Sequence, residues 1–287
     1  MLEQGATGIN GPHQGAWVST QTGEDWFLHF QDKEAYGRIV HLQPMKWIGD
    51  WPVMGADKDG DGKGEPVLRH KKPHVGKSYT VQTPRDNDEF NETQLGLQWQ
   101  WLANPKATWA FLYKSRGVLR LYTQPIPASD RNLWQVPNLL LQKFPAESFS
   151  VTTKVTLTFN PKVDGENAGL VVMGLSYAGL ALKSSAGGVD LVYVTAKDAD
   201  KGIAEEEKKL KHFKESLFYL RVTVLPGAQC RFSWSLDGRH FTDAGAAFTA
   251  RPGRWTGARV GLFATRTGTT NDAGFADFDW FRVERID

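Results

Sequence analysis

Carboxylate side chains occur at alternating positions in one short, turn-rich loop of this chain. The segment Asp57-Lys58-Asp59-Gly60-Asp61-Gly62 places them at positions 1, 3 and 5 of an EF-hand-type calcium loop, with glycine at position 6. Position 12 is Leu68, where a bidentate glutamate is expected, although Glu65 could compensate from position 9. Two interpretations stay open at this point, a calcium site and a plain Asp/Gly turn.

Two other residues could recognise a hydroxylated ligand. An imidazole such as that of His13 can hydrogen-bond a sugar hydroxyl, and the guanidinium of Arg38 can offer two donors at once. The alternatives are a turn histidine bonded to nearby backbone and an exposed strand arginine. The sequence contains no G-x-S-x-G, HExxH, P-loop or GxGxxG pattern. Carboxylate pairs lie in predicted turns, and no spacing singles out a general acid and a general base.

Composition excludes several classes of protein. The chain of 287 residues is 40% hydrophobic, which is ordinary for a globular protein, and has no apolar run long enough to cross a membrane. A net charge of +2 without a dense basic stripe argues against nucleic acid as a partner. The first residues lack the basic and apolar regions of a signal peptide. The one cysteine, Cys230, is expected to be a thiol packed within a strand.

Short strands and turn signals fill the first part of the chain. Segments 16–20, 26–31, 38–42 and 52–55 are expected strands, and Thr22-Gly23-Glu24-Asp25 is one of the turns between them. Four strands in about 45 residues have the size of one β-propeller blade. The loop after residue 55 and a basic, proline-broken stretch mark a boundary. We therefore expect domains at residues 1–78 and 79–287.

Longer strands recur through the second part. About a dozen of them, with Asp237-Gly238 as a strong hairpin signal, predict a two-sheet β-sandwich, so the fold class is all-β. The charged stretch 199–216 breaks the pattern; we expect a solvated hairpin connection there, with a helical turn as the alternative.

Several motifs together resemble glycoside hydrolase family 43, the β-xylosidases and α-L-arabinofuranosidases. They are Gly11-Pro12-His13-Gln14-Gly15 in the first part, then Leu95-Gly96-Leu97-Gln98-Trp99-Gln100-Trp101, Ala168-Gly169-Leu170-Val171-Val172-Met173-Gly174 and Ala276-Asp277-Phe278-Asp279-Trp280-Phe281. Residues 9–55 look like the final blade of the family's five-bladed catalytic propeller. Residues 79–285 are similar to the concanavalin A-like sandwich appended to many of its β-xylosidases.

The resemblance implies an inverting mechanism, which needs an acid and a base on opposite faces of the sugar. In the family, these carboxylates precede the His-Gln-Gly segment, and only 12 residues precede His13 here. We therefore expect a truncated family 43 hydrolase without its catalytic carboxylates, which binds xylo- or arabino-oligosaccharides. The alternative is an active hemicellulose glycosidase, with a new site or with a propeller completed by another chain.

The resemblance also implies particular site residues. His13, Gln14 and Arg38 match the sugar pocket, so the expected partner is a plant cell-wall oligosaccharide of the xylan or arabinoxylan type. Asp88 and Asp279, near the two ends of the sandwich, match a structural calcium site, with cross-strand pairing to lysine or arginine as the alternative. A propeller blade without neighbouring blades would leave apolar side chains uncovered, so we expect the chain to form a homodimer through residues 9–55. Family members are often periplasmic or secreted.

Overall fold

The computed structural model describes residues 2–12, 14–126, 132–160, 163, 165–269 and 274–286. The chain divides into two compact units, Met1–Thr83 and Pro84–Asp287. The sequence placed the boundary between residues 78 and 79, at the end of the basic stretch. In the structure, the extended segment up to Thr83 belongs to the first unit.

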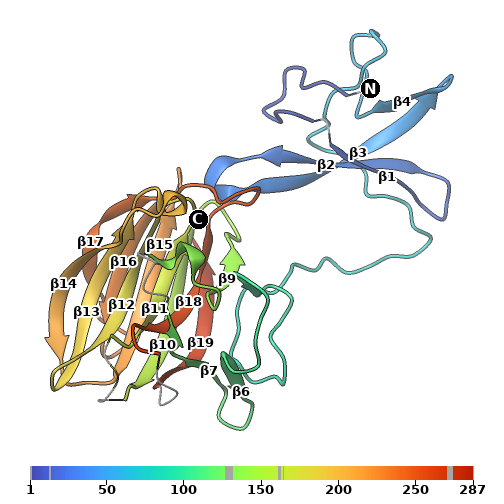
Figure 1. Ribbon diagram of the computed structural model, residues 1–287. Coiled ribbons are helices and arrows are strands. Elements are labelled where there is room, and N and C mark those ends of the chain that lie inside the picture. Colours follow the sequence, from blue (N-terminus) through green and yellow to red (C-terminus); the bar gives the residue numbers. More distant parts are fainter. Residues whose placement is uncertain are drawn as a thin grey trace. The chain divides into compact units, whose positions relative to one another are not determined.

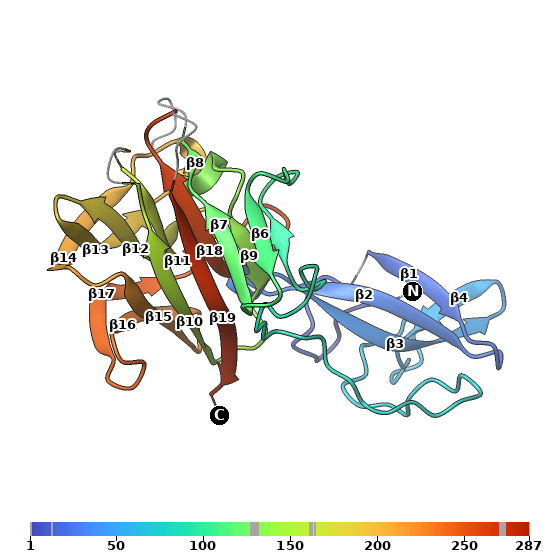
Figure 2. The ribbon, with the colours of Figure 1, turned by 90° about the horizontal axis from the view of Figure 1, so that it is seen from below.

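The first unit is built on a four-stranded antiparallel sheet whose spatial order follows the chain order (Figure 2). One cross-strand row joins Trp17, Phe27 and Gln43, which fixes the register. Such chain-order pairing through short turns is what strands this close in sequence favour. The strands are β1 (Gly15–Ser19), β2 (Asp25–Asp32), β3 (Arg38–Ile48) and β4 (Trp51–Met54).

The two faces of this sheet differ in how well they are covered. On one face, Gln31 donates to the carbonyl of Gly8, and Gln43 accepts from the backbone N–H of Val67, so flanking segments lie over it. Gln43 is 1% exposed as a result. The opposite face, here called the open face, buries Trp26 and Val53 but leaves several other apolar side chains in solvent, with Trp51 69% exposed. Its exposed apolar members are Val18, Val40, Leu42, Ile48 and Trp51.

The second unit is a sandwich of two antiparallel sheets, which confirms the predicted fold class (Figure 1). The first sheet has the order β17-β16-β15-β10-β19-β7-β6 and the second β14-β13-β12-β11-β18-β9-β5, with β8 paired in parallel to β18. Many of these neighbours are distant in sequence, so the sheets form only as the whole unit folds. The strands are β5 (Gln100–Trp101), β6 (Ala110–Tyr113), β7 (Val118–Tyr122), β8 (Gln124–Pro125), β9 (Leu140–Lys143), β10 (Phe149–Thr158), β11 (Asn167–Met173), β12 (Tyr177–Ser185), β13 (Gly188–Ala196), β14 (Glu206–Phe213), β15 (Leu217–Leu225), β16 (Gln229–Ser235), β17 (Thr242–Thr249), β18 (Arg259–Arg266) and β19 (Phe275–Arg285).

Alternate residues of both sheets form the core between them. Strand β15 contributes Phe218, Leu220, Val222 and Val224 from one face, all fully buried. The other sheet contributes residues such as Leu170, which pairs across β12 and β18 with further buried leucines. Period-2 alternation of β-branched and aromatic side chains on a pleated strand produces this arrangement.

Two local predictions hold in the sandwich. The Asp237-Gly238 segment joins β16 to β17, which pair antiparallel, and Gly238 has a φ of 71° that suits glycine in a tight turn. Cys230 is fully buried on β16, and burial raises the pKa of its thiol to about 12. The described residues also include the short 3₁₀ helices η1 (Glu34–Tyr36), η2 (Leu133–Gln135) and η3 (Ala199–Lys201). No helix among them is long and apolar enough to span a membrane.

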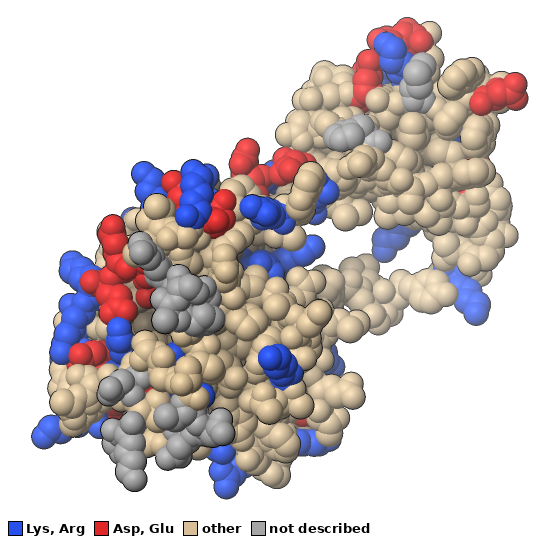
Figure 3. Space-filling model, in the orientation of Figure 1, with Lys and Arg blue, Asp and Glu red and all other residues tan. Residues whose placement is uncertain are grey.

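The prediction for residues 199–216 was wrong in one respect. The stretch contains η3, but it then forms β14, an edge strand paired to β13. Its side chains are mostly exposed and charged, and Lys209 pairs with Asp190 of β13 at 2.7 Å. Charged side chains of both signs gather along this edge of the sandwich (Figure 3). Such charges suit an edge strand because they discourage pairing with another sheet, so charge alone did not indicate a loop.

We expect the sandwich to fold without the first unit, because a domain of this size can bury its own core. Residues 84–287, expressed alone, should unfold in a single cooperative thermal transition near that of the same unit in the whole chain, followed by circular dichroism. The matching fragment 1–83 is the comparison and should be much less stable. A sandwich fragment without a cooperative transition would contradict this expectation.

Candidate functional site

Two of the three residues matched to a sugar pocket, Gln14 and Arg38, lie at one end of the four-stranded sheet. Gln14 is exposed just before β1, and Arg38 begins β3, so both lie at the same end. The Arg38 guanidinium carbon lies 4.3 Å from the centre of the Phe30 ring. That contact orients the guanidinium by a cation–π interaction. His13 lies outside the described residues.

A histidine stack on the covered face was not anticipated from the sequence. The rings of Phe27, His29 and His41 are stacked, with 5.3 Å between the two imidazole centres. His29 is 2% exposed, and burial lowers the pKa of both histidines. The register pairs His29 with His41 directly, so alternate positions of β2 and β3 meet in one row. Two stacked imidazoles therefore lie within this face, and only the register of β2 and β3 could have revealed that they meet.

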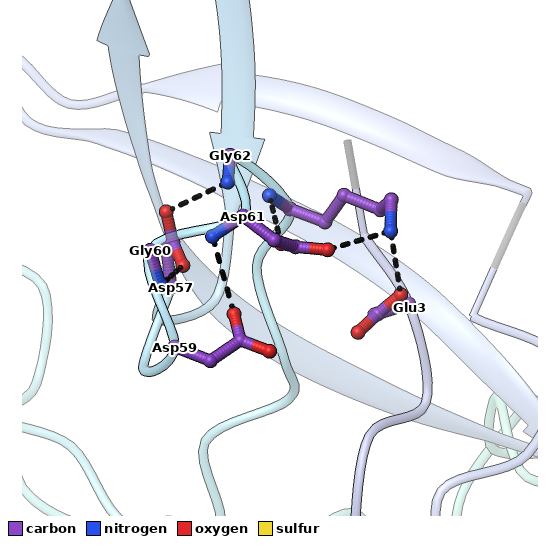
Figure 4. A network of polar contacts seen from close by, with 7 residues as sticks. Glu3, Asp57, Asp59, Gly60, Asp61 and Gly62 are labelled. Atoms are coloured by element: carbon purple, nitrogen blue, oxygen red, sulfur yellow. Dashed lines mark hydrogen bonds and ion pairs between the residues drawn. The ribbon is translucent and has the colours of Figure 1, made fainter.

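The acidic loop after β4 is held by its own backbone and by a lysine (Figure 4). Asp57 accepts from the backbone N–H groups of Gly60 at 2.7 Å and Gly62 at 3.1 Å. The Lys63 ammonium lies 2.6 Å from Asp61 and 3.3 Å from Glu3, and its hydrogen bond lowers the pKa of Asp61.

Carboxylate oxygens from two groups of three could reach a common ion, Asp57 with Asp59 and Asp61, and Glu3 with Asp59 and Glu65. Leu68, at the twelfth loop position, is 78% exposed. The arrangement has the contacts of an Asx-type turn. Among the described residues, two ammonium groups lie beside these carboxylates, that of Lys63 next to Asp61 and Glu3 and that of Lys58 at 3.0 Å from Glu65.

The two aspartates matched to a calcium site have separate protein partners. Asp88 accepts from the backbone N–H of Phe90 and from the indole N–H of Trp99, each at 2.8 Å. Its backbone also pairs with Phe281 of β19. Asp279 forms an ion pair with Lys154 on β10. The ion pair of Asp279 corresponds to the pairing alternative, whereas the contacts of Asp88 are with N–H groups. Calcium at Asp88 and Asp279 stays a prediction that chelation can test.

A hollow in the second unit lies on the outer face of the eight-stranded sheet. Its wall holds Glu205, whose Oε2 accepts from the Tyr177 hydroxyl at 2.5 Å. Burial raises the pKa of Glu205 to about 7, the neighbouring Glu207 adds to this, and Tyr177 and Lys183 oppose it. The sequence reasoning missed this carboxyl because it lay in a stretch interpreted as a solvated connection.

Comparison with known proteins agrees with the sandwich architecture. Residues 87–284 match the model of the beta-xylosidase C-terminal concanavalin A-like domain. Two curated relatives carry beta-xylosidase names. One, from Xylanibacter ruminicola, is 39% identical over 272 residues, which is 92% of this chain and 47% of the relative. The other, from Formosa agariphila, is 31% identical over 307 residues, which is 99% of this chain and 50% of the relative.

Solved structures give the same relationship. The crystal structure of the family 43 protein BlXynB from Bacillus licheniformis superposes with a TM-score of 0.75 at 26% identity, over 95% of this chain and 53% of that one. The fold and the sandwich core thus define a concanavalin A-like β-sandwich protein. The chain belongs to the beta-xylosidase C-terminal concanavalin A-like domain family of glycoside hydrolase family 43. It spans about half the length of the curated relatives it matches.

Replacing Asp88 with alanine should lower the free energy of unfolding of the sandwich by about 1–3 kcal/mol, because two N–H donors lose their acceptor. Phe90, one of the two, is 1% exposed and has a φ of 49°, so its backbone depends on such support. Urea unfolding measures the effect, with the exposed Glu92→Ala as the matched control.

Wild type, Asp88→Ala and Asp279→Ala together test for calcium at Asp88 and Asp279. Bound calcium would raise the Tm of the wild type, and chelator would remove that gain. Asp279→Ala and Asp88→Ala would then show no calcium-dependent shift. Equal shifts in wild type and variants would exclude these two carboxylates as ligands.

Glu205→Gln should change how stability depends on pH. The folded protein holds a proton on Glu205 up to about pH 7, whereas the unfolded chain releases it near the ordinary pKa of 4.5. The unfolded state therefore binds fewer protons in this window, and stability falls as pH rises from about 4.5 to about 7. The variant lacks this loss, so its Tm relative to wild type should increase from pH 5 to pH 8. A constant difference across this range would contradict the raised pKa.

Proposed function

We propose that this chain works as the supporting half of a family 43 hemicellulose glycosidase. In this proposal the sandwich and the four-stranded sheet hold and complete a catalytic propeller, whose other blades supply the acid and the base. The observation that carries it is the match over nearly all of this chain to about half of each beta-xylosidase-named relative. The catalytic pair of an inverting glycosidase would then come from the other half.

The open face of the first unit supports this proposal. Val40 is 66% exposed and Ile48 58% exposed, beside Trp51 at 69%, and all three lie on one face of the sheet. Exposed large apolar side chains gathered on one face often mark an interaction site. Propeller blades pack face to face, so each blade is apolar toward its neighbours. The open face therefore suits an adjacent blade, supplied by the rest of a longer polypeptide or by another chain.

The proposed substrate is an oligosaccharide of the xylan or arabinoxylan type. The curated relatives carry beta-xylosidase names, and a more distant one from Bacteroides ovatus is named a non-reducing end alpha-L-arabinofuranosidase, at 27% identity. In this proposal Gln14 and Arg38 contribute to the sugar pocket from the end of the four-stranded sheet, and His13 contributes to the same pocket. Their amide, guanidinium and imidazole groups can hydrogen-bond sugar hydroxyls.

The chain alone should not hydrolyse aryl β-xyloside or aryl α-L-arabinofuranoside at a measurable rate, because the general acid and base contribute orders of magnitude to turnover. Activity should appear when the chain is mixed with a separately expressed propeller half of a beta-xylosidase relative. The propeller half alone is the control. Turnover by the chain alone that survives repurification would instead favour an active site within this chain.

In the absence of other blades, we expect two copies to associate through their open faces at micromolar concentration. Sedimentation velocity should show a dimer for the wild type and a monomer for Val40→Asp, because a buried carboxylate without a partner is costly. Leu97→Asp, which alters an apolar side chain exposed outside this face, is the matched control and should stay dimeric. A monomeric wild type would contradict the prediction.

A further inference from the structure

The outer face of the eight-stranded sheet carries a hollow of about 430 Å³. This volume lies within the range of small-molecule sites, about 300–1,000 Å³. Segments 126 and 132–133 form one wall, and residue 205 with the start of β14 forms another. The hollow therefore lies wholly within the second unit, and segments that are far apart in the sequence line it.

The bottom of the hollow is apolar. Ala181 of β12, Val192 and Val194 of β13 and Phe263 of β18 line it, and each is at most 5% exposed. Ala181 pairs directly with Val192 across β12 and β13, so the apolar side chains form a continuous patch. A floor of this kind can pack against the C–H face of a small ring.

Polar groups line the rim, and one of them is fixed in place. Tyr177 is fully buried, its hydroxyl accepts from the backbone N–H of Leu133 at 2.9 Å, and it donates to Glu205 Oε2. Among the described residues, Glu205 Oε1 has no hydrogen-bond partner. A carboxyl held through one oxygen therefore presents the other at the wall of the hollow.

Further polar groups surround this carboxyl. The Lys183 ammonium contacts both oxygens of Glu207, at 2.7 and 2.8 Å. Thr265 donates to the amide oxygen of Asn167 at 3.0 Å. Lys183 is thus neutralised by Glu207, and Glu205 titrates near neutral pH, so the hollow carries little net charge. This balance suits a neutral ligand rich in hydroxyl groups better than an anion.

We propose that this hollow binds a neutral sugar ring, with the ring on the apolar floor and its hydroxyl groups hydrogen-bonded to Glu205 and the rim. A carboxylate can accept two hydroxyl hydrogens, and an ammonium can donate to a hydroxyl oxygen. A free monosaccharide and the end of a glycan share this chemistry. The choice of pentoses as first probes rests on the proposed function, whereas the site itself rests on the geometry.

Isothermal titration of the whole chain tests the site with D-xylose, L-arabinose, xylotetraose and D-glucose, and with D-glucosamine as a cationic comparison. We expect saturable binding of at least one sugar, weakened about tenfold or more in Glu205→Gln, because a hydrogen bond to a charged group is lost. Glu206→Gln is the matched control: it changes the adjacent carboxylate, which pairs with Thr195 and does not line the hollow, and should bind as the wild type does.

A second variant guards against a folding defect. Ala181→Leu adds carbons to the floor, so it should abolish binding while the thermal transition stays cooperative. Equal affinity for D-xylose and xylotetraose would mean that one ring is recognised, and tighter binding of xylotetraose would mean that the glycan continues along the rim. Binding of D-glucose without either pentose would support the hollow and count against the proposed substrate.

Two results would overturn the inference. One is that no sugar binds saturably to the wild type, or that Glu205→Gln and Ala181→Leu both bind as the wild type does. The other is that D-glucosamine binds far more tightly than D-glucose, which would assign the hollow to cations. The two proposals can fail separately. If the mixture of this chain with the propeller half is active but the hollow binds no sugar, the inference about the hollow fails while the proposed function stands.

Discussion

The last strand of the chain lies inside the seven-stranded sheet and not at its edge. Strand β19 is hydrogen-bonded to β10 on one side and to β7 on the other, and its Phe278 and Phe281 are fully buried. Asp88, near the start of the sandwich, pairs with the backbone of Phe281. The two ends of the second unit are therefore joined, so the seven-stranded sheet is complete only when the whole unit has folded. Long-range pairing of this kind makes folding cooperative but slow.

The same constraint explains why polar contacts gather around β19. Arg120 on β7 makes a bidentate ion pair with Asp277, both contacts 2.8 Å, and its guanidinium carbon lies 3.5 Å from the centre of the Phe275 ring. A fork-shaped guanidinium can meet a carboxylate with two bonds and an aromatic ring with its face. These contacts fix the register of a strand whose neighbours are separated from it by most of the unit.

In the eight-stranded sheet, the outer face also carries apolar side chains, and part of this face is covered by another segment of the chain. The segment around η2 lays Leu133, Val136 and Leu139 against Val171, Met173 and Tyr177, which makes a second apolar cluster outside the sandwich core. The cover does not extend over the whole face, and the hollow at Glu205 lies beside it. Tyr177 belongs to both, because its ring is part of the cluster and its hydroxyl holds the carboxyl. Packing and a candidate binding site thus depend on one side chain.

Much of this architecture follows from the sequence alone. Period-2 alternation, turn residues and the Asp237-Gly238 signal determine that strands form and that they pack as a sandwich, because these are local properties of neighbouring residues. The quoted motifs likewise carry the family relationship. Other features depend on which distant strands become neighbours. His29 meets His41 only through the register of β2 and β3, and Glu205 meets Tyr177 across the edge of a sheet.

The two aspartates matched to calcium show the same limit. The register of β10 and β19 shifts between Lys154 and Val155, so Asp279 is the extra residue of a bulge and its carboxylate pairs with Lys154, while Asp88 accepts from Trp99. A one-residue shift changes the direction of a side chain, and nothing local in the sequence encodes it. The sequence determined most of the elements, though not edge strand β14, and the family to which they belong. Tertiary structure alone decided which carboxyls are held by neighbours and which one faces a hollow, because those contacts arise from strand pairing between residues far apart in the chain.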